Sequence, residues 1–90
     1  MPAANERLKQ AILAVIAQQI QSNDPPQTKQ SLARLLAVGY SDEKARQLIG
    51  FVVGSEIFAV LREGRKYDED RYVAALAALP ELPWDREEGE

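Results

Sequence analysis

Glu56 is the residue whose type and position could most readily do chemistry, because helical periodicity places its carboxylate on a core-facing line. The apolar residues on that line are Ala45, Ile49, Val52 and Val60. A lone buried carboxylate with a raised pKa can act as a general acid or base. No second acid, nucleophile or oxyanion donor stands at a recognisable spacing from it. A structural role is therefore favoured, with Gln19 or Arg34 as the partner of the buried Glu56.

Histidine and cysteine are both absent from the 90 residues of the chain. Their absence removes the commonest proton-transfer group, the thiol nucleophile and the usual ligands of zinc and copper. The acids Asp68, Glu69 and Asp70 do not form a calcium loop, since the alternating acids, central glycine and final glutamate of that loop are missing. We expect them to cap a helix. The sequence predicts no catalytic residue, no metal site and no cofactor.

A helix-turn-helix is one alternative use of the middle of the chain. Residues 39–41 would form the turn, with Lys44, Arg46 and Gln47 as base-reading side chains on the following helix. The charge argues against this alternative. The formal net charge of −3 belongs to residues 85–90, and the rest of the chain is balanced. Binding to DNA phosphates needs clustered lysine and arginine, so the sequence argues against a nucleic-acid partner.

Two helices are predicted in the first half of the chain. The first covers about residues 5–21, with Gln19 in the middle of its apolar face. That face consists of Leu8, Ile12, Val15, Ile16 and Ile20. We expect Asp24 to cap the second helix, with Pro25 at its first position and Gly39 at its end. Leu32, Leu35 and Leu36 are predicted to face inward.

The third helix is predicted to run from a cap at Ser41 to a termination at Gly64, and it is apolar on almost every side. Its inward residues are Ala45, Leu48, Ile49, Val52, Val53 and Val60. Asp68 is predicted to cap a short fourth helix that ends before Pro80. The predicted fold class is all-α: a four-helix array with short turns, in which helix three is central. The sequence predicts a single helical domain over residues 1–80 and an acidic, flexible tail over residues 81–90.

Gly50 and Gly54 have a G-x-x-x-G spacing inside the third helix, where each glycine costs about 1 kcal/mol relative to alanine. Another helix is expected to pack closely over them, either within the domain or across a dimer interface. Phe51 and Phe58 lie off the main apolar stripe, and Trp84 lies in the tail. Together with Gly54 these aromatic residues form a candidate interface, although they could instead pack within the chain.

Several local motifs resemble a known family over about residues 8 to 64. They are Asn23-Asp24-Pro25-Pro26, then Leu32, Leu35 and Leu36, then Gly39-Tyr40-Ser41, Ala45 and Ile49-Gly50. This pattern resembles a bacterial domain family of unknown function. The family's first and third helices carry histidines and a glutamate that would suit a metal. Here those positions are Leu13, Ala17, Glu43 and Gln47. The resemblance implies a helical architecture without an assigned activity, and it implies no metal-linked role.

The sequence as a whole predicts a small, non-enzymatic interaction or structural module that buries an apolar helical surface. The predicted partner is another protein or a second copy of the chain. Spanning a bilayer takes about 20 consecutive apolar residues, and no run in the chain approaches that length. No secretory signal is evident either, so we expect a cytoplasmic protein without membrane contact. The alternatives are a DNA-binding helix-turn-helix protein and a ligand-binding domain centred on Glu56.

Overall fold

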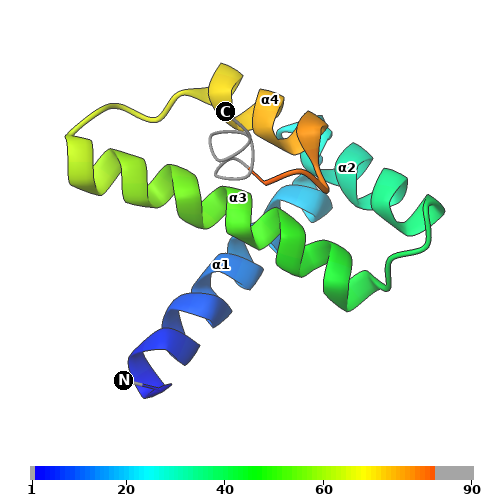
Figure 1. Ribbon diagram of the computed structural model, residues 1–90, viewed down its shortest axis with the longest axis horizontal. Coiled ribbons are helices and arrows are strands. Elements are labelled where there is room, and N and C mark those ends of the chain that lie inside the picture. The colour runs from blue at the N-terminus through cyan, green and yellow to red at the C-terminus, as the bar shows by residue number, and fades with distance from the viewer. Residues whose placement is uncertain (1, 83–90) are drawn as a thin grey trace.

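The computed structural model describes residues 2–82, with side chains from residue 6 onward, and shows four helices (Figure 1). They are α1 (Pro2–Ser22), α2 (Pro26–Ala37), α3 (Asp42–Glu63) and α4 (Glu69–Ala78). No strand occurs within these residues. Helix α3 contacts each of the other three helices. The prediction of an all-α, four-helix array with a central third helix is therefore confirmed.

The two ends of α3 and the start of α4 are fixed by local signals that the sequence predicts. The Ser41 hydroxyl oxygen accepts a hydrogen bond from the backbone N–H of Lys44 at 3.1 Å. At the other end, Gly64 has a φ of 67°, a left-handed conformation that glycine adopts without steric cost. Asp68 Oδ1 accepts from the N–H of Arg71 at 3.1 Å and so caps α4. All three assignments are confirmed.

The start of α2 differs from the prediction. Asp24 does not cap this helix, because Pro25 occupies the cap position in an extended conformation and makes no side-chain cap bond. The helix begins at Pro26, whose missing N–H costs nothing because the first N–H groups of a helix have no intrahelical acceptor. The first backbone bond of the turn runs from Thr28 N to Pro25 O at 3.2 Å. The second proline therefore takes the position expected for the first.

Gly39 ends α2 by a two-bond motif that follows the last helical residue, Ala37. The N–H of Gly39 donates to Leu36 O at 3.1 Å, and the N–H of Tyr40 donates to Leu35 O at 3.1 Å. This pair of bonds is a Schellman motif, and the φ of 114° at Gly39 is the left-handed geometry that the motif requires. Tyr40 packs against the core, as expected of the residue after such a glycine. The turn into α3 is thereby fixed.

The core lies between α3 and the three helices around it. Its buried apolar residues are Ile16, Leu32, Leu35, Ala45, Leu48, Ile49, Val52, Val53, Tyr72, Leu76 and Leu79. The prediction that Leu8, Val15 and Leu36 face inward is wrong, because all three are exposed. For the two residues of α1 the reason is geometric. This helix crosses α3 steeply near Ile12, so the chain leaves α3 both before and after the crossing (Figure 1). Leu8 lies on the amino-terminal part, which extends beyond the body of the protein, and Val15 lies at the edge of a groove after the crossing.

The glycines of α3 mark the place where α1 crosses. A Cβ atom at Gly50 would lie 3.4 Å from Ile12 Cγ2 and 3.7 Å from Ile16 Cδ1. At Gly54 a Cβ atom would lie 3.6 Å from Ile12 Cδ1. The close approach predicted from the G-x-x-x-G spacing is therefore found within the domain, and Ile12 is the residue that fills the strip.

Replacing Gly54 with alanine is expected to raise the free energy of unfolding by up to about 1 kcal/mol. The added methyl group makes an ordinary contact with Ile12, and the unfolded chain loses conformational freedom. Gly64→Ala is the control. Its Cβ meets nothing within 4 Å, so only the left-handed backbone acts, and we expect a loss of about 1 kcal/mol. Urea unfolding at one protein concentration measures both changes. Destabilisation by Gly54→Ala would contradict the described packing.

Candidate functional site

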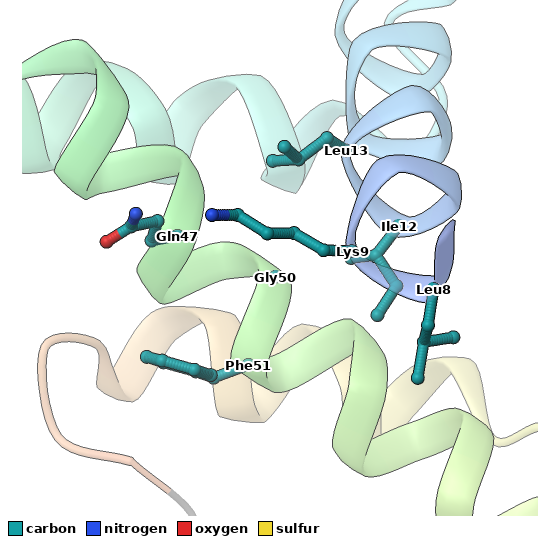
Figure 2. A pocket seen from close by; sticks show the side chains of 7 residues that line it. All are labelled: Leu8, Lys9, Ile12, Leu13, Gln47, Gly50 and Phe51. Atoms are coloured by element: carbon teal, nitrogen blue, oxygen red, sulfur yellow. The ribbon is translucent and has the colours of Figure 1, made fainter. Parts of the chain in front are cut away.

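The crossing of α1 over α3 leaves one groove toward the amino end of α3 (Figure 2). It has a volume of about 420 Å³ and is lined by Leu8, Lys9, Ile12, Leu13, Gln47, Gly50 and Phe51. Figure 2 shows the Lys9 side chain extending from α1 toward Gln47 on α3, while Gly50 contributes only backbone. The lining is apolar apart from one ammonium group and one amide. We call this the amino-end groove. It offers surface for contact but no reactive pair of groups.

A second hollow lies toward the carboxyl end of α3, and we call it the carboxyl-end groove. It measures about 360 Å³ and is lined by Val15, Gln19, Val53, Glu56, Ile57, Val60, Leu61, Tyr67 and Tyr72. Four of these residues, Val15, Ile57, Leu61 and Tyr67, are large apolar or aromatic side chains that remain exposed to solvent. Leu61 is 76% exposed, the highest value among the exposed large hydrophobic residues. An apolar surface of this kind marks a contact site more often than a catalytic one.

Two residues that line the carboxyl-end groove, Gln19 and Tyr72, form a hydrogen-bonded group with the buried Thr28. Gln19 Oε1 accepts from the Thr28 hydroxyl at 2.7 Å and from the Tyr72 hydroxyl at 2.9 Å. Thr28 is fully buried and Tyr72 is 2% exposed, so these bonds join α1, α2 and α4 inside the core. Burial raises the pKa of Tyr72 above the usual tyrosine value, and its hydrogen bonds to Thr28 and Gln19 act in the opposite direction. These hydrogen bonds hold the three helices together and leave no reactive group free.

Glu56 is buried as predicted, with 8% of its surface exposed, but its predicted partners are wrong. Neither Gln19 nor Arg34 pairs with it. The partner is Arg71 of α4, whose Nε lies 2.7 Å from Glu56 Oε2 and whose Nη2 lies 3.2 Å from Oε1. The hydrogen bond to Glu56 raises the pKa of Arg71. Because both carboxylate oxygens accept from one guanidinium, Glu56 is held as an ion-pair partner.

Arg34, the other predicted partner of Glu56, instead satisfies the carboxyl end of α4. Its Nη2 donates to Leu76 O at 2.9 Å, and its Nη1 donates to Leu79 O at 3.4 Å. The last carbonyls of a helix have no intrahelical partner, and a cation is favoured at that end of the dipole. Sequence reasoning missed both arginine contacts, since the pairing of side chains on different helices depends on how those helices pack.

A third hollow, which we call the arginine groove, lies between α3 and α4. It has a volume of about 300 Å³ and is lined by Val52, Ser55, Glu56, Phe58, Ala59, Arg62, Glu63, Arg65, Arg71 and Ala75. The guanidinium of Arg62 stands over the Phe58 ring, 5.4 Å from its centroid. Arg65 Nε donates to Glu63 Oε1 at 2.6 Å. Three arginines, one each from α3, the connection after it and α4, therefore line this groove together with two glutamates.

The predicted interface residues fall in different places. Phe51 lines the amino-end groove and is 48% exposed, while Phe58 lines the arginine groove and is 59% exposed. Gly54 contacts Ile12 of α1. Trp84 lies outside the described residues. The structure thus does not bring Phe51, Gly54 and Phe58 into one hollow. The carboxyl-end groove was missed because Ile57 and Leu61 are exposed only where α1 turns away from α3, which helical periodicity does not show.

Two of the three predicted base-reading residues, Lys44 and Arg46, differ in their surroundings on α3. Lys44 is exposed, whereas Arg46 Nε bonds Asp42 Oδ1 at 2.8 Å, so one of the two cations already has an anionic partner. Within residues 2–82 no group of three or more acidic, histidine or cysteine side chains is placed to hold a metal ion. No helix in that part of the chain is long and apolar enough to cross a membrane.

Comparisons with protein-family models, with curated proteins and with solved structures found no match. The resemblance to a bacterial domain family of unknown function stays a prediction. The function proposed below therefore depends on the geometry of this chain.

Tyr72→Phe is expected to lower the free energy of unfolding at neutral pH by about 1 kcal/mol, because it removes the hydrogen bond to Gln19. The wild-type chain should also lose stability as the pH rises above about 10, since the unfolded chain releases the tyrosine proton before the folded chain does. The variant should show a weaker alkaline loss. Urea unfolding across this pH range measures both effects.

Tyr67→Phe is the control for this experiment, because the Tyr67 side chain is 54% exposed and lies beside Tyr72. Burial also raises the pKa of Tyr67. Because about half of this side chain is exposed, its ionisation should lower the free energy of unfolding less than that of Tyr72 does. We expect its alkaline loss to stay close to that of the wild type. An equal effect of the two variants would contradict the special role of Tyr72.

Proposed function

We propose that this protein is a small, non-enzymatic interaction module that associates with a second copy of itself through the carboxyl-end groove. The observation that carries the proposal is an exposed apolar wall at one groove. It is formed by Val15 of α1, Ile57 and Leu61 of α3, and Tyr67 of the connection between α3 and α4. Isolated exposed apolar side chains are common on protein surfaces, but a shared groove of them favours contact with another apolar surface.

The polar groups of this groove support an apolar partner. Gln19 Oε1 accepts hydrogen bonds from the Thr28 and Tyr72 hydroxyls, and both Glu56 oxygens accept from Arg71. A partner therefore gains little by offering polar groups to these atoms, whereas it gains by covering the apolar wall. Burying an apolar side chain that was exposed contributes about 1.5–3 kcal/mol when the burial is complete.

A second copy of the chain is the partner that matches this surface without further assumptions. In a two-fold dimer the same patch meets itself, so each copy buries the same apolar residues and the gain is doubled. A chain of 90 residues buries a smaller share of its surface on folding than a larger domain does. Association then adds to the stability of the folded state.

The ligand-binding alternative centred on Glu56 is testable with Glu56→Gln. We expect a lower unfolding midpoint, because the neutral amide weakens the bond to Arg71. We expect at most a small loss of self-association, because Glu56 lines the groove but is buried and is not part of its exposed apolar wall. Arg71→Gln serves as the matched partner variant and should lower the midpoint in the same direction. Circular dichroism melting and sedimentation measure the two properties. Loss of association in Glu56→Gln alone would favour a site at that carboxylate.

Leu61→Lys is expected to weaken self-association by about tenfold or more, because it places a charge in the apolar contact. Leu61 is exposed, so the folding of one copy should change by no more than about 0.5 kcal/mol. Val38→Lys is the matched control, since Val38 is exposed at 66% and lines none of the three grooves.

Sedimentation equilibrium over a range of concentrations makes the measurement. The apparent mass of the wild type and of Val38→Lys should rise with concentration from the mass of one chain, 10.0 kDa, toward twice that mass. The apparent mass of Leu61→Lys should stay closer to that of one chain at the same concentrations. A wild-type mass of one chain at the highest concentration would overturn the proposal of self-association. The predicted cytoplasmic location stays a prediction.

A further inference from the structure

The amino-end groove holds a positive charge that the proposed function does not use. Lys9 extends from α1 into this groove toward Gln47 of α3 (Figure 2). No carboxylate among the described residues lies within ion-pair distance of the Lys9 ammonium. Glu6, the acid that stands nearest to it along α1, instead accepts a hydrogen bond from Gln10 Nε2 at 3.3 Å. Within that part of the chain the ammonium group therefore has no anionic partner.

The polar groups of the groove favour an anion with a single negative charge. The Lys9 ammonium offers three N–H donors and no acceptor, and the Gln47 amide on the facing helix adds N–H donors of its own. An ionised carboxylate accepts hydrogen bonds through two oxygens and carries one charge, so it matches one ammonium group. A phosphate monoester carries about 1.5 to 2 charges at neutral pH, which one cation does not balance. Charge complementarity therefore favours a monocarboxylate.

The rest of the groove favours an apolar body behind that carboxylate. The apolar side chains of its lining are Leu8, Ile12, Leu13 and Phe51. Leu8 and Phe51 are exposed, so an occupant that covers them removes apolar surface from water. The groove volume of about 420 Å³ falls within the range of roughly 300–1,000 Å³ that is typical of small-molecule sites. Such sites combine a mainly apolar lining with a few polar groups, as this groove does.

We propose that the amino-end groove is a binding site for a free aliphatic monocarboxylate. The carboxylate accepts hydrogen bonds from the Lys9 ammonium and the Gln47 amide, and the hydrocarbon body lies along Leu8 and Ile12. An aliphatic body suits the groove because three of its four apolar side chains are aliphatic. The occupant contacts α1 and α3 at once.

Octanoate is the probe for this site, and octylammonium is the matched probe with the same hydrocarbon chain and the opposite charge. We expect octanoate to shift the backbone amide NMR signals of Lys9, Gln47 and Gly50 in a saturable manner. Octylammonium should bind at least about threefold more weakly, because it loses the ion pair with Lys9 and is repelled by the same charge.

Lys9→Gln should weaken octanoate binding by about two- to fivefold, the range that one exposed ion pair supports, and should remove the preference for octanoate over octylammonium. The matched control is Lys29→Gln, which removes the same charge from an exposed position on α2 that lines none of the three grooves. It should leave the affinity unchanged. Both lysines are exposed, so circular dichroism should show the wild-type fold in each variant.

Leu8→Gln separates the role of the apolar lining from that of the charge. It keeps Lys9 and removes part of the exposed apolar wall, so it should weaken the binding of octanoate and of octylammonium alike.

Four results would overturn the proposal. The first is the absence of saturable shifts at Lys9, Gln47 and Gly50, and the second is equal affinity of the wild type for the two probes. The third is an octanoate affinity that Lys9→Gln leaves unchanged. The fourth is a shift of the same amides with protein concentration alone, since the occupant would then be a second copy of the chain. The titration needs no association at the carboxyl-end groove, so failure of self-association and failure of this proposal are distinguishable.

Discussion

The contact of Ile12 with the glycine strip of α3 is the constraint on which the arrangement of helices depends. Ile12 lies over both glycines, since a Cβ atom at Gly50 or Gly54 would lie 3.4 Å or 3.6 Å from it. The crossing sets the direction of α1. Because α1 then diverges from α3 on both sides of the contact, an apolar groove opens toward each end of α3. The surfaces proposed for contact thus follow from the place at which α1 crosses α3.

Polar side chains then connect the helices around this crossing. Gln19 joins α1 to α2 and α4 through Thr28 and Tyr72, and Glu56 joins α3 to Arg71 of α4. Arg34 joins α2 to the end of α4. Each bond fixes a position that apolar packing alone leaves adjustable, because buried polar groups cost free energy unless their partners are correctly placed. These groups are therefore occupied in holding the fold.

The helices could be predicted from local signals, whereas the contacts between them could not. Ser41, Gly64 and Asp68 act within one turn of chain, and the structure confirms all three. Predicting the partner of Glu56 requires knowing where α4 lies, and Arg71 was missed for that reason. Leu8 and Val15 share the periodicity of core residues, yet they are exposed because the crossing angle carries them past α3. Periodicity identifies an apolar face, but the packing angle decides how much of it is covered.

The extension of α1 beyond the body has a consequence for local motion. The side chains from Glu6 to Ala11 are exposed, so the first turns of this helix receive little support from neighbouring elements. A helical segment of that length without packing is marginal in water. Backbone amides at the start of α1 should therefore exchange their hydrogens by local fraying, while those near Ile16 exchange only when the core opens. Protection against hydrogen exchange should therefore increase along α1, and it should rise most sharply near the crossing with α3.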